Sequence, residues 1–136
     1  MAGAGEQNRS AVVAKVDPSL LSTHVPVLDD LASRHEQLWP ALSRKWSVGN
    51  PVPPWKSSLD GMCDALDDAS LAHPGTVLSF RERRNEEDAL SQERYADLPF
   101  PESQLLALAH SLVWRGVIDE DALRDRMVSV RQRLET

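Results

Sequence analysis

The pattern of hydrophobic and polar positions is clearest in the last third of the chain, where it predicts two consecutive helices. Apolar residues recur every three or four positions over about 100–115 and again over about 119–134, which is the period of one face of an α-helix. Gly116 falls between the two stretches, as glycine often does just beyond a helix end. Asp119 then supplies a side chain that can cap the next helix. The pattern therefore predicts a helical hairpin with a short turn.

Upstream, the same period predicts shorter helices separated by prolines. From Pro26 to Trp46, apolar residues recur on one helical face, although Pro40 lies inside the pattern and should kink or split the helix. After the proline-rich stretch 47–54, a further helix is expected at about 58–69, before a His-Pro-Gly triplet. That helix carries four apolar residues on one side: Leu59, Met62, Cys63 and Leu66.

The remaining segments are more polar. The stretch 81–95 is strongly charged, so we interpret it as a solvated helix that tertiary contacts hold only loosely. Residues 1–17 are small, polar and rich in Gly and Ala, and we expect a tail that is disordered or ordered by a partner. No strand-like alternation of useful length appears. The sequence thus predicts an all-α fold, an extended arrangement of short helices in a single domain, 18–136, that ends in the hairpin.

Composition and charge narrow the classes of partner. The 136 residues suit one small domain, and the net charge of −6 argues against nucleic acid as the main partner, because phosphate binding needs a basic face. No run of apolar residues is long enough to span a membrane, and the N-terminus lacks the pattern of a secretory signal. With Cys63 as the single cysteine, an internal disulfide is impossible, and we expect a cytoplasmic location.

The sequence offers little chemistry of its own. Cys63 and the four histidines are too widely spaced for a zinc site, and we expect the histidines to be exposed or half-buried. No phosphate-binding loop, dinucleotide-binding glycine pattern or nucleophile elbow is present. Adjacent carboxylates occur at 29–30, 67–68 and 86–88, and we expect solvent to surround them. An enzyme that works alone is therefore not expected.

The arginines of the last helix allow two interpretations. The helix carries Arg124, Arg126, Arg131 and Arg133, and Arg115 lies in the turn before it. The arginines of the helix border an apolar stripe formed by Leu123, Met127, Val130 and Leu134. An arginine at the edge of an apolar stripe is well placed to grip an anionic group of a partner. The alternative is solvated charge that balances nearby carboxylates, and the residues alone favour this alternative for any single arginine.

A longer motif resembles a known family. The segment from Phe100 to Gly116, Phe-Pro-Glu-Ser-Gln-Leu-Leu-Ala-Leu-Ala-His-Ser-Leu-Val-Trp-Arg-Gly, continues as Val-Ile-Asp-Glu-Asp-Ala-Leu to Arg124. It resembles the N-terminal helical region of nitrile hydratase β-type subunits and the related small subunit of thiocyanate hydrolase. In that family an aromatic residue and an acid open a helix, which ends at a glycine before an acidic helix start and an arginine. The resemblance is strongest over 95–136, and the stretch 114–117 is particularly similar to the thiocyanate hydrolase version.

The resemblance implies a function within an assembly. The family adds water to a nitrile to give an amide, or converts thiocyanate to carbonyl sulfide and ammonia. Low-spin cobalt(III) or iron(III) is held by a cysteine-rich claw on the α-type subunit, where two cysteines are oxidised. The resemblance places Arg124 at the β-type position that hydrogen-bonds to those oxidised sulfurs across the interface. This chain would itself bind neither metal nor cofactor.

The chain also departs from the family pattern. Conventional β-type chains are longer and continue into a tyrosine-rich helix and a small β-barrel, whereas this chain stops at Thr136. We therefore expect a three-chain enzyme in which a second β-type fragment supplies the barrel. Two alternatives stay open: an activator of nitrile hydratase that assists metal insertion transiently, and an unrelated helical adaptor.

Overall fold

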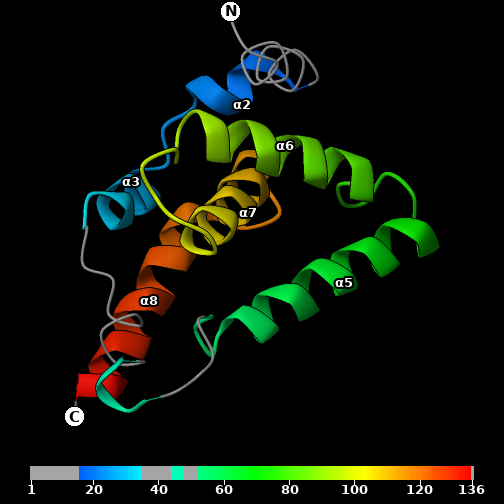
Figure 1. The fold of residues 1–136 in the computed structure, drawn as a ribbon. Helices are drawn as coiled ribbons and strands as arrows, with labels where there is room; N and C mark the ends of the chain where they lie inside the picture. The colour runs from blue at the N-terminus through cyan, green and yellow to red at the C-terminus, as the bar shows by residue number, and fades with distance from the viewer. Residues whose placement is uncertain (1–15, 35–43, 48–51, 136) are drawn as a thin grey trace, which may run out of the picture.

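The computed structural model describes residues 16–34, 44–47 and 52–135, and this part of the chain is helical with no strand, which confirms the all-α prediction. Figure 1 shows the arrangement of the helices. Their bounds are Pro18–Ser22 (α2), Pro26–Ala32 (α3), Lys56–Ala72 (α5), Phe80–Gln92 (α6), Glu102–Trp114 (α7) and Glu120–Glu135 (α8).

Helix α7 lies at the centre because it is apolar on two faces. One face contributes to the larger core, which α2, α3 and α6 complete and which contains Leu20, Val25, Leu28, Ala89, Leu90, Tyr95, Leu106 and Ala107. The other face packs toward α5 in a smaller core formed by Leu59, Cys63, Leu78, Leu108 and Leu112. A helix that is apolar nearly all round is expected to be buried on several sides.

The prediction that the charged stretch 81–95 is held only loosely is wrong. Among the described helices, α6 and α7 form the most extensively packed pair. Helix α6 buries both apolar and charged side chains. Ala89 and Leu90 enter the core, while Arg83 and Glu86 are buried beside partners of opposite charge. Because these charges are paired, a helix with few apolar residues can still be buried.

Two upstream predictions also change. The helix expected from Pro26 to Trp46 ends at Ala32, well before Pro40, and residues 35–43 lie outside the described part of the chain. Helix α5 is longer than the expected 58–69 and leaves Met62 exposed, although the other three apolar residues of its stripe face the core.

Residues 16 and 17, the last two of the tail expected at 1–17, are part of the folded structure. Val16 is buried in the larger core, and the Asp17 carboxylate accepts a hydrogen bond of 2.9 Å from the Ser19 backbone N–H, which caps α2. The rest of that expected tail, residues 1–15, lies outside the described residues.

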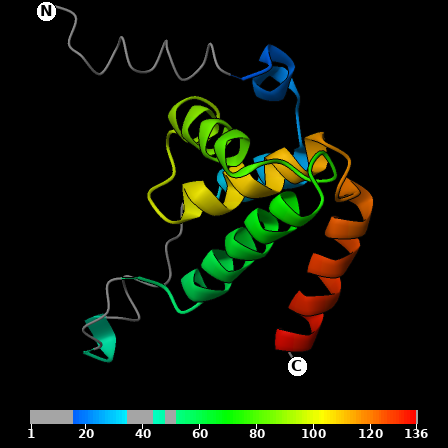
Figure 2. The ribbon, with the colours of Figure 1, turned by 90° about the vertical axis from the view of Figure 1, so that its right-hand side faces the viewer.

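The two C-terminal helices and the turn between them are as predicted. Gly116 takes a left-handed conformation, with φ of 76°, and the Asp119 carboxylate accepts a hydrogen bond of 3.0 Å from the Ala122 backbone N–H. Figure 2 shows that α8 then runs away from the end of α7 instead of packing along it. No residue of α8 is fully buried. The first half of the helix packs against the larger core through the partly buried Leu123 and Met127. None of the described helices meets the length and apolarity needed to cross a membrane.

Candidate functional site: the arginine-bearing face of helix α8

The predicted site residue, Arg124, lies on the second turn of α8. Its side chain is 45% exposed, and its guanidinium donates hydrogen bonds of 3.1 Å to Glu120 Oε1 and 3.2 Å to Asp121 Oδ1. Both partners belong to the preceding turn of the same helix. Glu120 is half-buried, whereas Asp121 is exposed, and exposed ion pairs contribute roughly 0–1 kcal/mol. A stronger anion from a partner could therefore displace the Asp121 contact at little cost.

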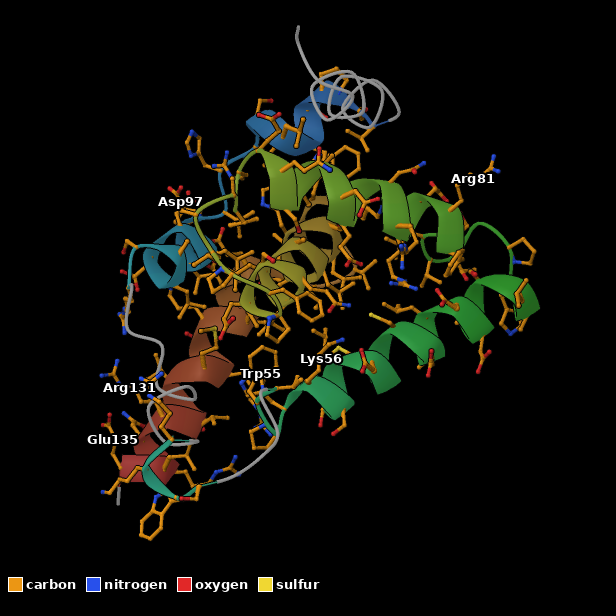
Figure 3. The ribbon with its side chains drawn as sticks, viewed as in Figure 1. Trp55, Lys56, Arg81, Asp97, Arg131 and Glu135 are labelled. Atoms are coloured by element: carbon orange, nitrogen blue, oxygen red, sulfur yellow. The ribbon has the colours of Figure 1, made fainter. Side chains whose placement is uncertain are left out.

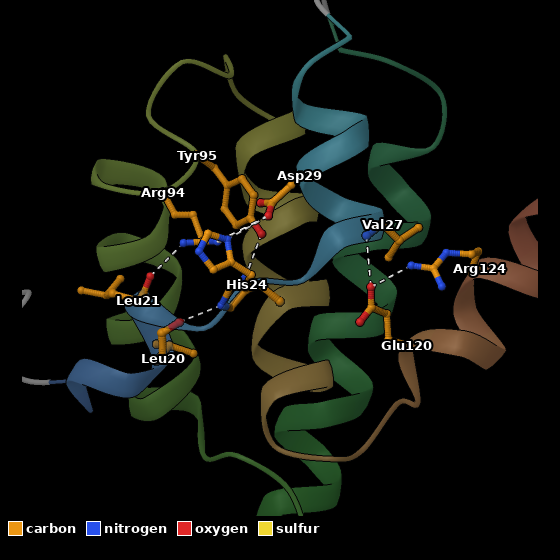
Figure 4. Close-up of polar contacts among 10 residues, drawn as sticks. Leu20, Leu21, His24, Val27, Asp29, Arg94, Tyr95, Glu120 and Arg124 are labelled. Atoms are coloured by element: carbon orange, nitrogen blue, oxygen red, sulfur yellow. Dashed lines mark hydrogen bonds and ion pairs between the residues drawn. The ribbon is translucent and has the colours of Figure 1, made fainter.

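Glu120 fixes this part of α8 against α3. The same Oε1 atom that accepts from Arg124 also accepts a hydrogen bond of 3.1 Å from the Val27 backbone N–H (Figure 4). Val27 lies in the first turn of α3, where backbone N–H groups have no partner within the helix and attract negative charge. Glu120 thus joins the start of α3 to Arg124 through one carboxylate.

A groove of about 330 Å³ runs between α3 and α8 beside Arg124. Apolar side chains form much of its wall, and arginines lie at its edge; the lining residues are Pro26, Val27, Asp30, Leu31, Arg34, Arg124, Met127, Val128 and Arg131. Asp30 of α3 and Arg34, two residues beyond the end of that helix, form an exposed ion pair of 2.8 Å. This combination suits a partner segment that carries both apolar and anionic groups.

The outer half of α8 carries an apolar surface. Met127, Val130 and Leu134 line a shallow depression that Arg126 and Arg131 border, and the Leu134 side chain is 80% exposed. Figure 3 shows Arg131 and Glu135 at the far end of α8, away from the packed helices. The Arg131 Nε atom donates a hydrogen bond of 2.9 Å to Glu135 Oε1, and this bond is the main reason why the pKa of Arg131 is raised.

Arg115 does not belong to this face. Its guanidinium points toward α6, where it forms an ion pair with Glu86 and donates to Glu82 Oε2 at 3.1 Å. The hydrogen bond to Glu86 is the main reason why the pKa of Arg115 is raised. The arginine in the turn is therefore structural and holds α6 against the end of α7, whereas Arg124, Arg126, Arg131 and Arg133 remain on exposed positions of α8.

His110 contradicts the expectation that the histidines are exposed or half-buried. It is fully buried, and its Nε2 atom lies 2.7 Å from the Leu20 carbonyl oxygen. A carbonyl oxygen only accepts, so Nε2 carries the proton, and Nδ1 accepts from the Tyr95 hydroxyl at 2.8 Å. Burial lowers the pKa of His110 and raises that of Tyr95, so both groups stay neutral. The pair ties α2 to α7, which is a structural role.

A second polar network had no signal in the sequence. Arg94 donates a hydrogen bond of 3.0 Å to the Leu21 carbonyl oxygen and one of 2.8 Å to His24 Nδ1, and it lies 3.4 Å from Asp29 Oδ2 (Figure 4). These partners lie far from Arg94 in the chain, so only the fold reveals the cluster. It fixes the connection between α2 and α3 and thereby the position of α3 beside α8.

Some of the carboxylates that we expected to be solvated are buried or half-buried in the structure. Glu86 is buried against Arg115, and both oxygens of Asp67 accept hydrogen bonds from Arg83, at 3.1 and 2.9 Å. Asp68 remains exposed, as expected. Glu86 and the half-buried Asp67 are thus engaged in ion pairs that hold separate parts of the fold together.

Cys63 lies in the smaller core, and burial raises the pKa of its thiol, which favours the unreactive protonated form. Among the described residues, no group of three or more His, Cys, Asp or Glu side chains could hold a metal ion. His35 lies outside the described residues.

Comparison of the chain with protein-family models, with curated proteins and with solved structures found no match. The resemblance of residues 95–136 to the nitrile hydratase family therefore stays a prediction from the motif. Any functional assignment depends on that motif and on the geometry of α8.

Proposed function

We propose that this chain is the metal-free β-type subunit of a heteromeric nitrile hydratase, an enzyme that adds water to a nitrile to form an amide. The observation that carries the proposal is the placement of Arg124. Its guanidinium is half-exposed at the edge of the groove between α3 and α8, where two carboxylates of its own helix hold it, the half-buried Glu120 and the exposed Asp121. This is the arginine to which the motif assigns contact with the oxidised cysteines of an α-type subunit.

The local geometry supports the motif at three further positions. Glu102 lies in the first turn of α7, Gly116 takes the left-handed conformation after that helix ends, and Asp119 caps α8. Together they fix where α8 begins and how it leaves α7, and they bring Arg124 to the outer surface. The spacing of the motif thus has a structural meaning in this chain.

The residues of this chain are better suited to contact the metal site of a partner than to bind a metal ion themselves. Cys63 is buried and is the single cysteine, so the cobalt(III) or iron(III) of the family would belong to the α-type partner, where it would supply the Lewis acidity. Arg124 would supply a planar cation with two parallel donors, which matches a compact sulfur oxyanion. Its contribution would be to orient and neutralise the ligands of the metal.

The small subunit of a thiocyanate hydrolase is the second candidate. The stretch Trp114-Arg115-Gly116-Val117 favours it, because this stretch is particularly similar to that version of the family. In both candidates a separate β-type fragment would carry the small β-barrel, and the assembly would work in the cytoplasm, where a lone reduced cysteine is ordinary.

The test is conservative substitution of Arg124 in the assembled enzyme. The tagged chain is purified from its own cells with whatever it binds, and hydration of a small aliphatic nitrile and hydrolysis of thiocyanate are both assayed. We expect Arg124→Lys to leave the complex intact and to lower turnover roughly tenfold to a hundredfold, because an ammonium cannot reproduce the two-pronged contact. Arg131→Lys is the matched control and should change turnover far less.

The same purification separates the subunit from the alternatives. A stable complex that retains cobalt or iron supports the role of a subunit. A complex that dissociates once the partner holds its metal supports the role of an activator. Full turnover of the Arg124→Lys enzyme would remove Arg124 from the site. Purification without any cysteine-claw chain would leave the helical adaptor as the better description.

A further inference from the structure

Helix α8 has the spacing of a coiled-coil helix. Leu123, Met127, Val130 and Leu134 follow one another at four, three and four positions and form one apolar stripe, which we name the α8 seam. The two positions that flank such a seam on either side determine which helix can pair with it. In α8 these flanking positions are all arginine: Arg124 and Arg131 on one side, Arg126 and Arg133 on the other.

The inner half of the α8 seam is already used, and the outer half is open. Leu123 and Met127 pack against the larger core. Val130 is half-buried and Leu134 is 80% exposed, and both line the depression on the outer half of the helix. No other described helix contributes to the lining of this depression.

Two of the flanking arginines, Arg126 and Arg131, are available to a partner. Among the described residues, no carboxylate pairs with Arg126, and Arg131 pairs only with Glu135 of its own helix. Both side chains of that pair are 64% exposed, so the pair is easily exchanged for another. The other carboxylates of α8, such as Asp121 and Asp125, lie at positions that do not flank the seam.

A second copy of this chain does not suit the surface. Two α8 helices packed through their seams, whether parallel or antiparallel, would bring arginine against arginine on both sides. Like charges at these positions destabilise a helix pair, and acidic residues there stabilise it. The arginines that flank the α8 seam form a basic face on a chain whose net charge is −6. This face therefore favours an acidic partner, which the rest of the surface would repel.

We propose that the outer half of α8 is a docking surface for an amphipathic helix of another polypeptide, one with acidic residues on both sides of its apolar stripe. Val130 and Leu134 would enter between its apolar side chains, and Arg126 and Arg131 would pair with its carboxylates. This proposal goes beyond the proposed function and does not depend on it, because it needs neither a metal nor Arg124.

The test uses the full chain and two designed peptides. Both peptides are about three heptads long and share a leucine seam; one carries Glu and the other Lys at every flanking position. Binding of each labelled peptide to the chain is measured by fluorescence anisotropy. At low ionic strength we expect the Glu peptide to bind roughly tenfold tighter than the Lys peptide, a preference that shrinks as salt is added.

Variants of exposed residues assign the binding to the α8 seam. Leu134→Asp should abolish binding of the Glu peptide, whereas Leu71→Asp, at an equally exposed leucine of α5, should leave it unchanged. The double variant Arg126→Glu, Arg131→Glu should reverse the preference and select the Lys peptide. Arg124 is unchanged in every variant, so a failure here is distinct from a failure of its proposed role.

Three results would overturn the docking proposal. The first is equal binding of the two peptides by the unaltered chain, or binding of neither. The second is binding of the Glu peptide that survives Leu134→Asp. The third is a dimer of the chain in sedimentation that Leu134→Asp dissolves, because the surface would then belong to a second copy.

Discussion

Tyr95 and His110 illustrate how much of this molecule depends on single buried polar contacts. The Tyr95 hydroxyl donates to His110 Nδ1, and His110 Nε2 donates to the Leu20 carbonyl oxygen, all within the larger core. A buried imidazole with both nitrogens satisfied is more stable in its neutral form, because protonation would bury a charge.

The first prediction is a loss of stability in mild acid that originates at His110. Its pKa is lowered in the folded protein, so between that value and the unfolded value near 6.5 only the unfolded chain takes up the proton. The contribution of His110 is therefore complete above about pH 6.5 and is lost as the pH falls, by at most about 1.4 kcal/mol per pH unit.

Urea unfolding followed by circular dichroism at about pH 7.5 and about pH 5.5 measures this loss. His110→Gln is the control, since its amide can still donate to Leu20 but does not titrate in this range. We expect the unaltered chain to lose more stability than the variant does between the two pH values. Equal losses would show that His110 is not the group responsible.

Residue-scale features differ in how far the sequence predicts them. The spacing of Cys63 within an apolar stripe correctly indicates a buried thiol, and burial raises its pKa. His110 also lies among apolar residues of its helix, and that position was the available sign of burial. The partners of Arg115 and Arg94 could not be predicted, because nothing local to either arginine names the distant carboxylate or carbonyl that it contacts.

At the scale of helices, the ends of α7 and α8 are determined locally. Gly116 and Asp119 act through their own backbone and the next few residues, which is why the sequence predicts this turn correctly. The burial of α6 depends instead on charge pairs with two other helices. Its composition alone therefore indicates a solvated helix, and that interpretation fails.

The second prediction contrasts two glycines. Gly116 has φ of 76°, and a Cβ added there would meet no atom within 4 Å, so Gly116→Ala should cost about 1 kcal/mol of unfolding free energy from the backbone alone. Gly61 lies inside α5, where a Cβ also meets nothing, so Gly61→Ala should stabilise the chain by about 1 kcal/mol. Opposite shifts of the urea midpoint would confirm this contrast, and shifts of the same sign would refute it.

The third prediction concerns the link between α5 and α6. Arg83 is buried and donates two hydrogen bonds to Asp67, so Asp67→Ala should leave a buried guanidinium with weaker compensation from Glu87, which lies 3.5 Å away. We expect a loss of about 2–3 kcal/mol in urea unfolding.

Asp68→Ala provides the matched control for this link, since Asp68 is the exposed neighbour of Asp67 on the same helix. Its effect should stay within about 0.5 kcal/mol. Similar losses for the two variants would mean that the Arg83 pair does not hold the helices together.

At the scale of the whole molecule, the proposed function depends most on the divergence of α8 from α7. A sequence with two adjacent amphipathic helices predicts a hairpin, but the direction of the second helix depends on what its apolar stripe finds to contact. Here the first half of the stripe reaches the larger core beside α3, and the second half projects beyond it. The fold thereby presents Arg124 and the outer α8 seam on the surface, where the proposed partner would meet them.

In the proposed assembly, α8 carries Arg124 to a metal site of another polypeptide. The most direct measurement is a structure of the complex that the tagged chain forms in its own cells. We expect the guanidinium of Arg124 within hydrogen-bond distance of oxidised cysteine ligands of a cobalt or iron ion on the partner. A complex in which Arg124 faces bulk water, or still pairs only with Glu120 and Asp121 far from any metal, would contradict it.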